Sequence, residues 1–256
     1  MPKSMNEGGA YRHFASLYDA LMMDAPYEQW LDFLKKKLAE YDKEAARLLD
    51  VGCGTGTLAI LLSEMGFRVT GVDLSEEMLT IAMNKALAEN QNIVFLQQDM
   101  RALDVGETFP VITAFCDVIN YLETYEDVEQ TFRSVCEHLD EGGLFLFDVH
   151  SIYKVDHLFQ GASFSYAGEE LSYIWDCFEG PYEHSVDHEL SFFVQTDSDL
   201  YQRFDEVHHQ RTFDQELYAR ALEKSGFKVL SIEGDFKEGI PDEHAERLFF
   251  TAIKEK

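Results

Sequence analysis

The sequence predicts an α/β fold, a doubly wound sheet of seven strands with an antiparallel β insertion after the fifth strand. Short apolar runs alternate with helical patterns over the first 150 residues, which favours a parallel sheet covered by helices on both faces. Between about residues 163 and 211 the helical period is lost, and strand patterns are separated by turn signals. The alternation then resumes. We therefore expect a core of residues 1–150 and 212–256 and an insertion of residues 151–211.

The elements before the sheet are predicted to be helical. Residues 11–19 form an aromatic-rich segment with a helical pattern. Asp24 and Pro26 begin a longer helix that runs to about Tyr41, because an acid at the N-cap and a proline in the first turn both favour a helix start.

Five apolar runs predict the parallel strands, at 47–51, 68–72, 93–97, 111–115 and 144–148. The helices between them have recognisable ends. Gly66 closes a helix over 57–64, and Ser75 caps the next one, which carries two acids in its first turn. Thr124 begins a third helix, which we expect to end at Gly142-Gly143.

The insertion contains four predicted strands, at 164–166, 171–178, 189–195 and 201–209. After it, the run from Thr212 to Gln215 fits a capping box, in which a threonine and a glutamine satisfy the first N–H groups of a helix. This helix is expected to end at Gly226, and strands at 227–233 and 248–254 complete the sheet.

Composition excludes several classes of protein. The 48 acidic and 21 basic residues give a net charge of −27, which argues against a nucleic-acid partner because such proteins need a basic surface. No apolar run approaches the ~20 residues that span a bilayer, and the N-terminus lacks the apolar region of a signal peptide. Four cysteines without C-x-x-C spacing indicate reduced thiols. We expect a cytoplasmic protein, a monomer or homodimer, with no membrane partner.

Histidines in the insertion raise the question of a metal site. His184 and His188 lie an even number of residues apart, so a strand would point both to one face. Zinc needs three or four convergent ligands, and no Cys-x-x-Cys or His-Glu-x-x-His motif supports them. We therefore expect no metal.

The run from Asp50 to Gly56 is the most informative motif, with glycines at 52, 54 and 56 between a strand and a helix. Glycine is required where the backbone turns with positive φ or lies against a ligand. The following helix N-terminus attracts an anion. A dinucleotide fingerprint, G-x-G-x-x-G, would need its third glycine at the position of Thr57. The spacing disfavours that ligand, although an NAD-type oxidoreductase remains an alternative.

An acid followed by G-x-G-x-G resembles the class I S-adenosylmethionine (SAM) methyltransferases. The resemblance runs from about residue 11 to the C-terminus. The chain is similar to small bacterial enzymes of the glycine/sarcosine and aminosugar N-methyltransferase type, especially a Firmicutes subgroup. The resemblance implies a Rossmann-like sheet whose last strand is antiparallel, with SAM as cofactor. It also implies methyl transfer by in-line displacement to a small-molecule acceptor, an amine or a hydroxyl.

The resemblance also implies a set of cofactor-binding residues: Tyr11, Tyr18, Asp50, Gly52, Cys53, Gly54, Thr55, Gly56, Asp73, Leu74, Met78, Asp99, Met100 and Cys116. By this resemblance Asp50 attracts the ligand ammonium, Asp73 accepts the ribose hydroxyls and Asp99 accepts from the adenine amino group. Three simpler roles stay open: a helix cap for Asp73, a turn acid for Asp99 and core packing for Met78. The two N-terminal tyrosines fold over the cofactor or form a hydrophobic flap.

Catalytic residues are expected at the ends of strands four and five. By resemblance, a main-chain carbonyl near Cys116 contacts the methionine amine, and Asn120 and Tyr121 lie beside the sulfonium, since an amide oxygen and an aromatic face favour a cation. Simple packing is the alternative for Tyr121. His150 is the candidate general base, useful only if the acceptor must lose a proton.

The insertion is expected to roof the acceptor site or to hold a dimer partner. Its candidate substrate contacts are Tyr166, Tyr173, Trp175, His208 and Arg211. Strand alternation assigns their faces only relative to one another. Alternatives to a small acceptor are RNA, a protein substrate, or SAM binding without catalysis.

Overall fold

A seven-stranded sheet forms the centre of the protein, seen here in a computed structural model that describes Met22 and residues 25–43, 45–196 and 200–255. Its spatial order is β10-β11-β5-β4-β1-β2-β3. The strands are β1 Arg47–Val51, β2 Arg68–Asp73, β3 Val94–Gln97, β4 Phe109–Ala114, β5 Leu139–His150, β10 Phe227–Gly234 and β11 Arg247–Lys254. The first five run parallel, and β11 lies antiparallel to both β5 and β10. The predicted fold class is confirmed.

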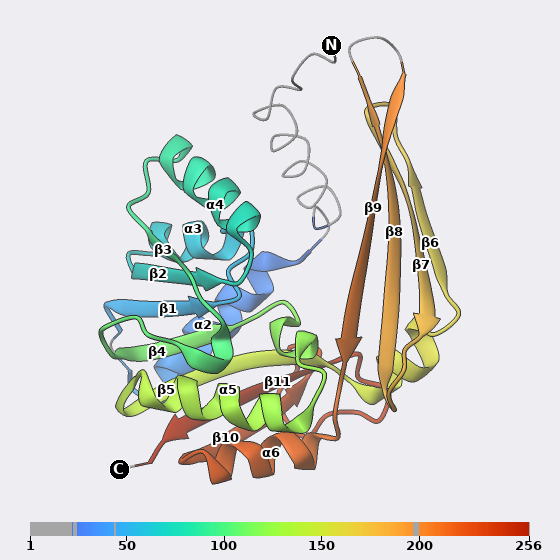
Figure 1. The fold of residues 1–256 in the computed structure, drawn as a ribbon. Coiled ribbons are helices and arrows are strands. Elements are labelled where there is room, and N and C mark those ends of the chain that lie inside the picture. Colours follow the sequence, from blue (N-terminus) through green and yellow to red (C-terminus); the bar gives the residue numbers. More distant parts are fainter. Residues whose placement is uncertain (1–21, 23–24, 44, 197–199, 256) are drawn as a thin grey trace.

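Helices cover both faces of this sheet (Figure 1). They are α2 Tyr27–Glu40, α3 Thr57–Glu64, α4 Glu76–Ala88, α5 Tyr125–Glu137 and α6 Gln215–Lys224. Trp30 and Leu34 of α2 pack with α3 on one face, and Phe132 of α5 packs with Tyr218 of α6 on the other. Each such buried side chain contributes roughly 1.5–3 kcal/mol, so two apolar layers fix the sheet between them. The carboxyl ends of the parallel strands consequently meet at one rigid edge.

The insertion folds as a separate four-stranded antiparallel sheet in the order β6-β7-β8-β9. Its strands are β6 Ser163–Ala167, β7 Leu171–Glu179, β8 Ser185–Gln195 and β9 Tyr201–Arg211. A short π-helix, η3 (Lys154–Phe159), precedes it and packs Val155 and Phe159 against β7 and β8. The sheet stands beside the carboxyl ends of the parallel strands (Figure 1).

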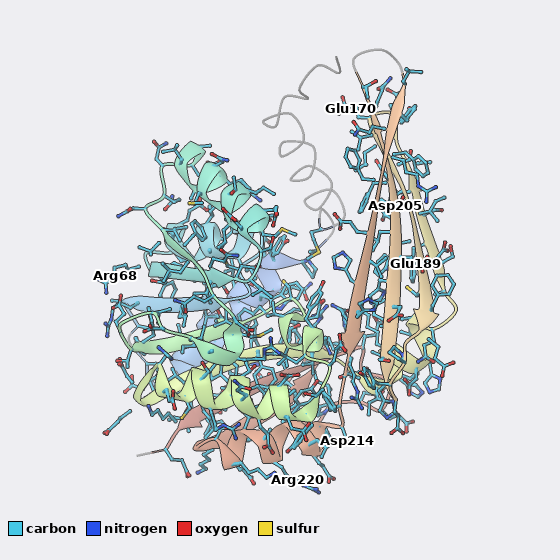
Figure 2. All side chains as sticks on the ribbon, in the orientation of Figure 1. Arg68, Glu170, Glu189, Asp205, Asp214 and Arg220 are labelled. Carbon is cyan, nitrogen blue, oxygen red and sulfur yellow. The ribbon has the colours of Figure 1, made fainter. Side chains whose placement is uncertain are left out.

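Charged side chains lie on the outside of the core and of the four-stranded sheet. Arg68, Asp214 and Arg220 lie on the exterior of the core, whereas Glu189 and Asp205 lie on the four-stranded sheet (Figure 2). All five residues are exposed. These charged side chains are therefore solvated.

The predicted end of the third helix is wrong. Helix α5 ends at Glu137 instead of at Gly142-Gly143, because Leu139 already pairs with Phe109 of β4. Gly142 turns the chain inside β5 with φ of 70°.

The predicted capping box is also wrong. The N-cap of α6 is Asp214, whose carboxylate accepts the N–H of Glu216 at 2.9 Å. Thr212 instead donates its hydroxyl to the carbonyl of His150 at 2.6 Å. The N-cap of α2 is Pro26, and Asp24 lies outside the described residues. Within the described ranges, no helix is both long and apolar enough to cross a membrane.

Candidate active site

The glycine turn joins β1 to α3 in a conformation that only glycine adopts easily. Gly52, Gly54 and Gly56 have φ of 69°, 53° and 76°. A Cβ on Gly52 would lie 2.3 Å from Cγ1 of Val118, a distance that no side chain tolerates. The N–H groups of Gly52 and Cys53 both donate to the carbonyl of Val72, at 2.7 and 3.0 Å. The turn is therefore fixed to β2, and it holds the N-terminus of α3 at the sheet edge.

Asp73 ends β2 and is part of the same turn. Its Oδ2 accepts the N–H of Gly54 at 2.8 Å, and its Oδ1 accepts the N–H of Ser75 at 2.9 Å. Ser75 in turn caps α4 by accepting the N–H of Met78, as predicted. Each carboxylate oxygen has a second acceptor position, so Asp73 holds the loop and still has capacity for a ligand hydroxyl.

Asp50 at the end of β1 has one carboxylate oxygen without a partner. Its side chain is buried, and its Oδ1 accepts from the hydroxyl of Thr113 at 2.9 Å. Its Oδ2 is buried and has no hydrogen-bond partner among the described residues. Burial raises the pKa of Asp50 to about 7, opposed by Thr113 and reinforced by the charge of Asp73. An unpaired buried carboxylate oxygen costs about 1–3 kcal/mol or more, so this atom is a strong candidate for ligand contact.

Asp99 follows β3 and is already bound to a cation. Its carboxylate pairs with Arg101 at 2.6 Å and accepts the main-chain N–H of the same residue at 2.9 Å. These bonds hold the pKa of Asp99 below its ordinary value. The resemblance implies that Leu74 and Met78 pack on the adenine and that a main-chain N–H beside Asp99 meets its ring. Leu74 is exposed, whereas Met78 and Met100 are half-buried.

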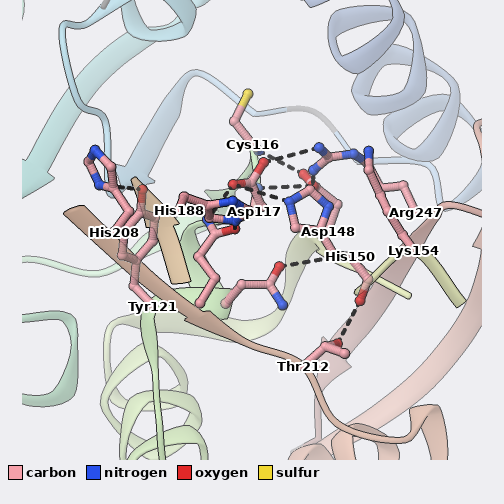
Figure 3. Close-up of polar contacts among 12 residues, drawn as sticks. Cys116, Asp117, Tyr121, Asp148, His150, Lys154, His188, His208, Thr212 and Arg247 are labelled. Atoms are coloured by element: carbon pink, nitrogen blue, oxygen red, sulfur yellow. Dashed lines mark hydrogen bonds and ion pairs between the residues drawn. The ribbon is translucent and has the colours of Figure 1, made fainter. Parts of the chain in front are cut away.

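The turn after β4 is held by the end of β5. The backbone of Cys116 and Asp117 adopts the left-handed conformation, with φ of 62° and 56°. Their N–H groups donate to Oδ1 and Oδ2 of Asp148 at 2.8 and 3.1 Å. Arg247 of β11 forms ion pairs with both Asp117 and Asp148 (Figure 3). Asp148 also accepts from the indole N–H of Trp30 at 2.8 Å. This network stabilises a strained turn next to Tyr121.

Asn120 and His150 do not lie where catalysis was expected. Asn120, in the 3-10 helix η2 (Val118–Tyr121), is fully buried. Its amide oxygen accepts the N–H of His150 and its amide nitrogen donates to the carbonyl of Arg211, both at 2.9 Å. With both groups used by the main chain, it joins three elements instead of facing a sulfonium.

His150 is enclosed by protein. Only 4% of the residue is exposed, its Nε2 lies 3.6 Å from Asp117, and its ring packs edge-on against Phe159. Burial holds its pKa below the ordinary value, although the charge of Asp117 opposes this. A base sealed in this way has no route to an acceptor, so the structure does not support the predicted role.

One face of the insertion sheet, which we call the inner face, points to this edge. It comprises Phe164, Tyr166, Tyr173, Trp175, Cys177, Val186, His188, Leu190, Phe192, Val194, Gln202, Phe204, Glu206, His208 and Gln210. Four of the five predicted substrate contacts therefore share one face. His208 reaches the core, since its Nδ1 lies 3.3 Å from the hydroxyl of Tyr121 (Figure 3).

A second connection between sheet and core is buried. The indole N–H of Trp175 donates to Nδ1 of His188 at 3.0 Å, and Nε2 of His188 lies 3.2 Å from the amide oxygen of Gln210. The amide nitrogen of Gln210 donates to Asp117 at 2.8 Å. Burial lowers the pKa of His188 to about 4, so this imidazole is neutral at neutral pH. The chain of bonds fixes the insertion against the turn after β4.

Arg211 differs from the other predicted substrate contacts. Its guanidinium donates to the carbonyls of Glu123 and Glu183, at 2.7 and 3.2 Å, and lies over the rings of Tyr182 and Phe213. Arg211 pairs with Ser185 of β8, and its side chain points to the opposite face of the sheet from that of His208. The residue therefore stabilises the base of the insertion and does not face the inner side.

Cys53 and Thr55 are buried residues of the glycine turn. Burial raises the pKa of the Cys53 and Cys116 thiols well above the ordinary value, so both remain protonated. Tyr11 and Tyr18 lie outside the described residues.

Glu206, Gln210 and Arg247 were missed by sequence reasoning. The two-residue spacing of Glu206 and Gln210 from His208 was the available signal, because it places all three on one face of a strand. Arg247 gave no local signal. In the part of the chain that the structure describes, no group of three or more His, Cys, Asp or Glu side chains is arranged to hold a metal ion.

Comparison with known proteins gives consistent matches. A family model described as a methyltransferase domain matches residues 23–232. A protein of Geobacillus sp. (strain WCH70), named as a methyltransferase, is 51% identical over 245 residues, covering 95% of this chain and 99% of its own.

Two solved structures show the same fold. A SAM-dependent methyltransferase from Clostridium acetobutylicum ATCC 824 matches with a TM-score of 0.87 and 31% identity, over 96% of this chain and 100% of that one. The SAM-bound amino pentose methyltransferase of Micromonospora echinaspora has a TM-score of 0.75 and 21% identity, with 93% and 96% covered.

Proposed function

Because this chain belongs to the SAM-dependent methyltransferases, we propose that it methylates the nitrogen of a small amine held between Tyr121 and the inner face of the insertion. The contact between Tyr121 and His208 carries the proposal, since it joins the edge of the core to that face. Membership of this family removes the oxidoreductase alternative.

The residues around the glycine turn fit the cofactor. SAM supplies a methyl group on a positively charged sulfur. The unpartnered Oδ2 of Asp50 suits the cationic ammonium at one end of that molecule. The spare acceptor positions of Asp73 suit the ribose hydroxyls. Leu74 and Met100 offer apolar surface to the adenine ring. If Asp99 accepts from the adenine amino group, its carboxylate must bind that group and Arg101 at the same time.

Alignment is the main task of this chain's own residues. Holding two reactants in a productive geometry lowers the activation free energy by on the order of 7–11 kcal/mol relative to their collision in solution. Asp148 accepts hydrogen bonds from the main-chain N–H groups of Cys116 and Asp117, and these bonds fix the turn that precedes Tyr121. The hydrogen bonds from Gln210 to Asp117 and from Asn120 to Arg211 fix the inner face relative to that turn. The proposed acceptor site thus draws on residues of both the core and the insertion.

The chemistry of the inner face supports an amine. Tyr166 stacks on Tyr173 with ring centroids 5.8 Å apart, and Trp175 packs beside them against Phe164. Glu206 places a carboxylate on the same face, two strands away from Trp175. Aromatic faces and a carboxylate together favour a small cation or a protonated amine. An amino sugar, such as the amino pentose named for the Micromonospora enzyme, has this chemistry.

Turnover with a panel of acceptors tests the proposal. The purified protein with SAM should release S-adenosylhomocysteine with amino-sugar nucleotides or small amines, and not with analogues in which hydroxyl replaces the amine. Tyr121→Phe should lower kcat while leaving S-adenosylhomocysteine affinity unchanged. Turnover restricted to hydroxylated analogues, RNA or protein, or binding without any turnover, would refute the assignment.

A further inference from the structure

Three side chains, two from β9 and one from η2, form a continuous polar chain at the proposed acceptor site. Glu206 and His208 are two residues apart on β9 and so share the inner face. Oε2 of Glu206 lies 3.1 Å from Nε2 of His208, and Nδ1 of His208 lies 3.3 Å from the hydroxyl of Tyr121. The Tyr121 and His208 rings meet edge to face at 78°. The chain ends at the residue that follows the turn after β4.

The partners define the direction of these hydrogen bonds. A carboxylate only accepts, so Nε2 of His208 carries the hydrogen and donates to Glu206. In the neutral imidazole Nδ1 is then unprotonated and accepts the hydroxyl of Tyr121. The tyrosine oxygen keeps a lone pair for a further donor, such as an amine N–H.

The tyrosine itself is a poor anion here. Desolvation of its hydroxyl end, followed by the charge of Asp117, raises the pKa of Tyr121 above its ordinary value, although 46% of the residue is exposed. A proton that reaches this oxygen must therefore leave by another group, and His208 is the titratable side chain within hydrogen-bond distance of it.

The charged groups that surround His208 are carboxylates. Its neighbour on β9 is Glu206, and across the strand pair it faces His188, which burial keeps neutral. From η2 it meets Tyr121, and Asp117 lies at the start of that helix. Among the described residues packed around it, the ionised neighbours are thus carboxylates, which stabilise a positive charge.

We propose that His208, oriented by Glu206, takes the proton that the acceptor amine must lose, with the Tyr121 hydroxyl as the group that touches the amine. This inference rests on the amine acceptor proposed above. The nitrogen lone pair forms the new bond to the methyl carbon, and the pair of the broken methyl–sulfur bond stays on sulfur. One N–H bond of the amine breaks as the new bond forms, returning its pair to nitrogen. Its proton goes to the oxygen of Tyr121 as the tyrosine proton passes to Nδ1 of His208.

Kinetics of variants with the best amine from the panel test this relay. His208→Ala should lower kcat by about 10²–10⁴-fold, the range for a lost general base, and added imidazole should restore part of it. Glu206→Gln should lower kcat less and move the acidic limb of its pH profile to lower pH, because the imidazolium loses its neighbouring charge. S-adenosylhomocysteine affinity, measured by calorimetry, should stay as in the wild type for both variants.

His209 provides the matched control. It is adjacent in sequence, lies on the opposite face and pairs with Asp187 at 2.8 Å, so His209→Ala should leave kcat within about twofold of wild type. An unchanged kcat and pH limb in both test variants, with an active wild type, would overturn the relay alone. An active wild type that uses no amine would overturn the proposed acceptor class and the relay with it. If His208→Ala does not fold, the pH limb of Glu206→Gln decides.

Discussion

The carboxylate of Asp148 accepts the main-chain N–H of Cys116 at 2.8 Å, joining the ends of two neighbouring parallel strands. The bond holds a left-handed residue in place. Asp148 is fully buried, so its negative charge must be matched nearby, and Arg247 does so from the antiparallel strand β11. The position of the proposed active-site turn thus depends on a residue near the far end of the chain.

Removing the cation of Arg247 should therefore be costly. Arg247→Met leaves the carboxylates of Asp117 and Asp148 buried without their partner, and the expected loss is about 3–5 kcal/mol of unfolding free energy. Urea denaturation measures it. Arg220→Met, which removes an exposed partner of Glu216, should change stability by less than about 0.5 kcal/mol. Equal effects of the two substitutions would contradict the structural role of Arg247.

Cofactor binding should release a proton from Asp50. With its pKa near 7 in the free protein, Asp50 is about half protonated at pH 7, and a bound ammonium favours the ionised form. S-adenosylhomocysteine carries that ammonium, so its binding enthalpy at pH 7 should differ between phosphate and Tris buffers by about half their difference in ionisation enthalpy. Asp50→Asn keeps an acceptor for Thr113 and should abolish this difference. A buffer-independent enthalpy in the wild type would refute the contact.

Alanine at Gly52 should be destabilising for two separable reasons. The added Cβ meets Val118 at 2.3 Å, and alanine resists a φ of 69°, so Gly52→Ala should cost about 2–4 kcal/mol. Combined with Val118→Ala, the steric part should disappear. Gly66→Ala is the control, because that glycine also has positive φ but no atom within 4 Å of its Cβ, and it should cost only about 1–2 kcal/mol. Strictly additive effects in the double variant would rule out the clash.

Stability should fall in mild acid through His188. Its pKa is about 4 in the folded protein against an ordinary value of 6.5, so the unfolded chain binds the extra proton between those values. The folded state then loses stability as pH falls from 6.5 towards 4, by roughly 2 kcal/mol at pH 5. Comparison of urea denaturation at pH 7.5 and 5 isolates this contribution, because His188→Gln should lose less stability over the same interval. The same loss in both proteins would exclude His188 as the cause.

Local patterns predicted much of the fold because local physics determines it. Strand β1 and helix α3 have the predicted bounds, since an apolar run, a glycine turn and a helical period coincide there. The capping box failed because Thr212 has a stronger tertiary partner, the buried carbonyl of His150. Sequence offers no means of choosing between Thr212 and Asp214 when both are good caps.

The location of the candidate site at one edge of the sheet was predictable, but the side-chain contacts within it were not. Topology alone brings Asp50, Asp73 and Cys116 to the carboxyl ends of adjacent strands. Whether His150 is open or sealed depends on Phe159 and Asp117, which reach it from two other elements, the helix η3 and the turn after β4. The orientation of the insertion was likewise undetermined, because alternation fixes relative faces and the Tyr121–His208 contact fixes the absolute one.

The insertion leaves the core after His150 and returns at Thr212, and the hydroxyl of Thr212 bonds to the carbonyl of His150. The chain thus leaves the core and returns to it at the same place in the molecule. A sheet attached in this way is exchangeable in evolution: a different one grafted between the same two residues would alter which molecules are accepted and leave the methyl-donor half unchanged. Divergence of substrates among enzymes of this architecture then requires no redesign of the half that binds the methyl donor.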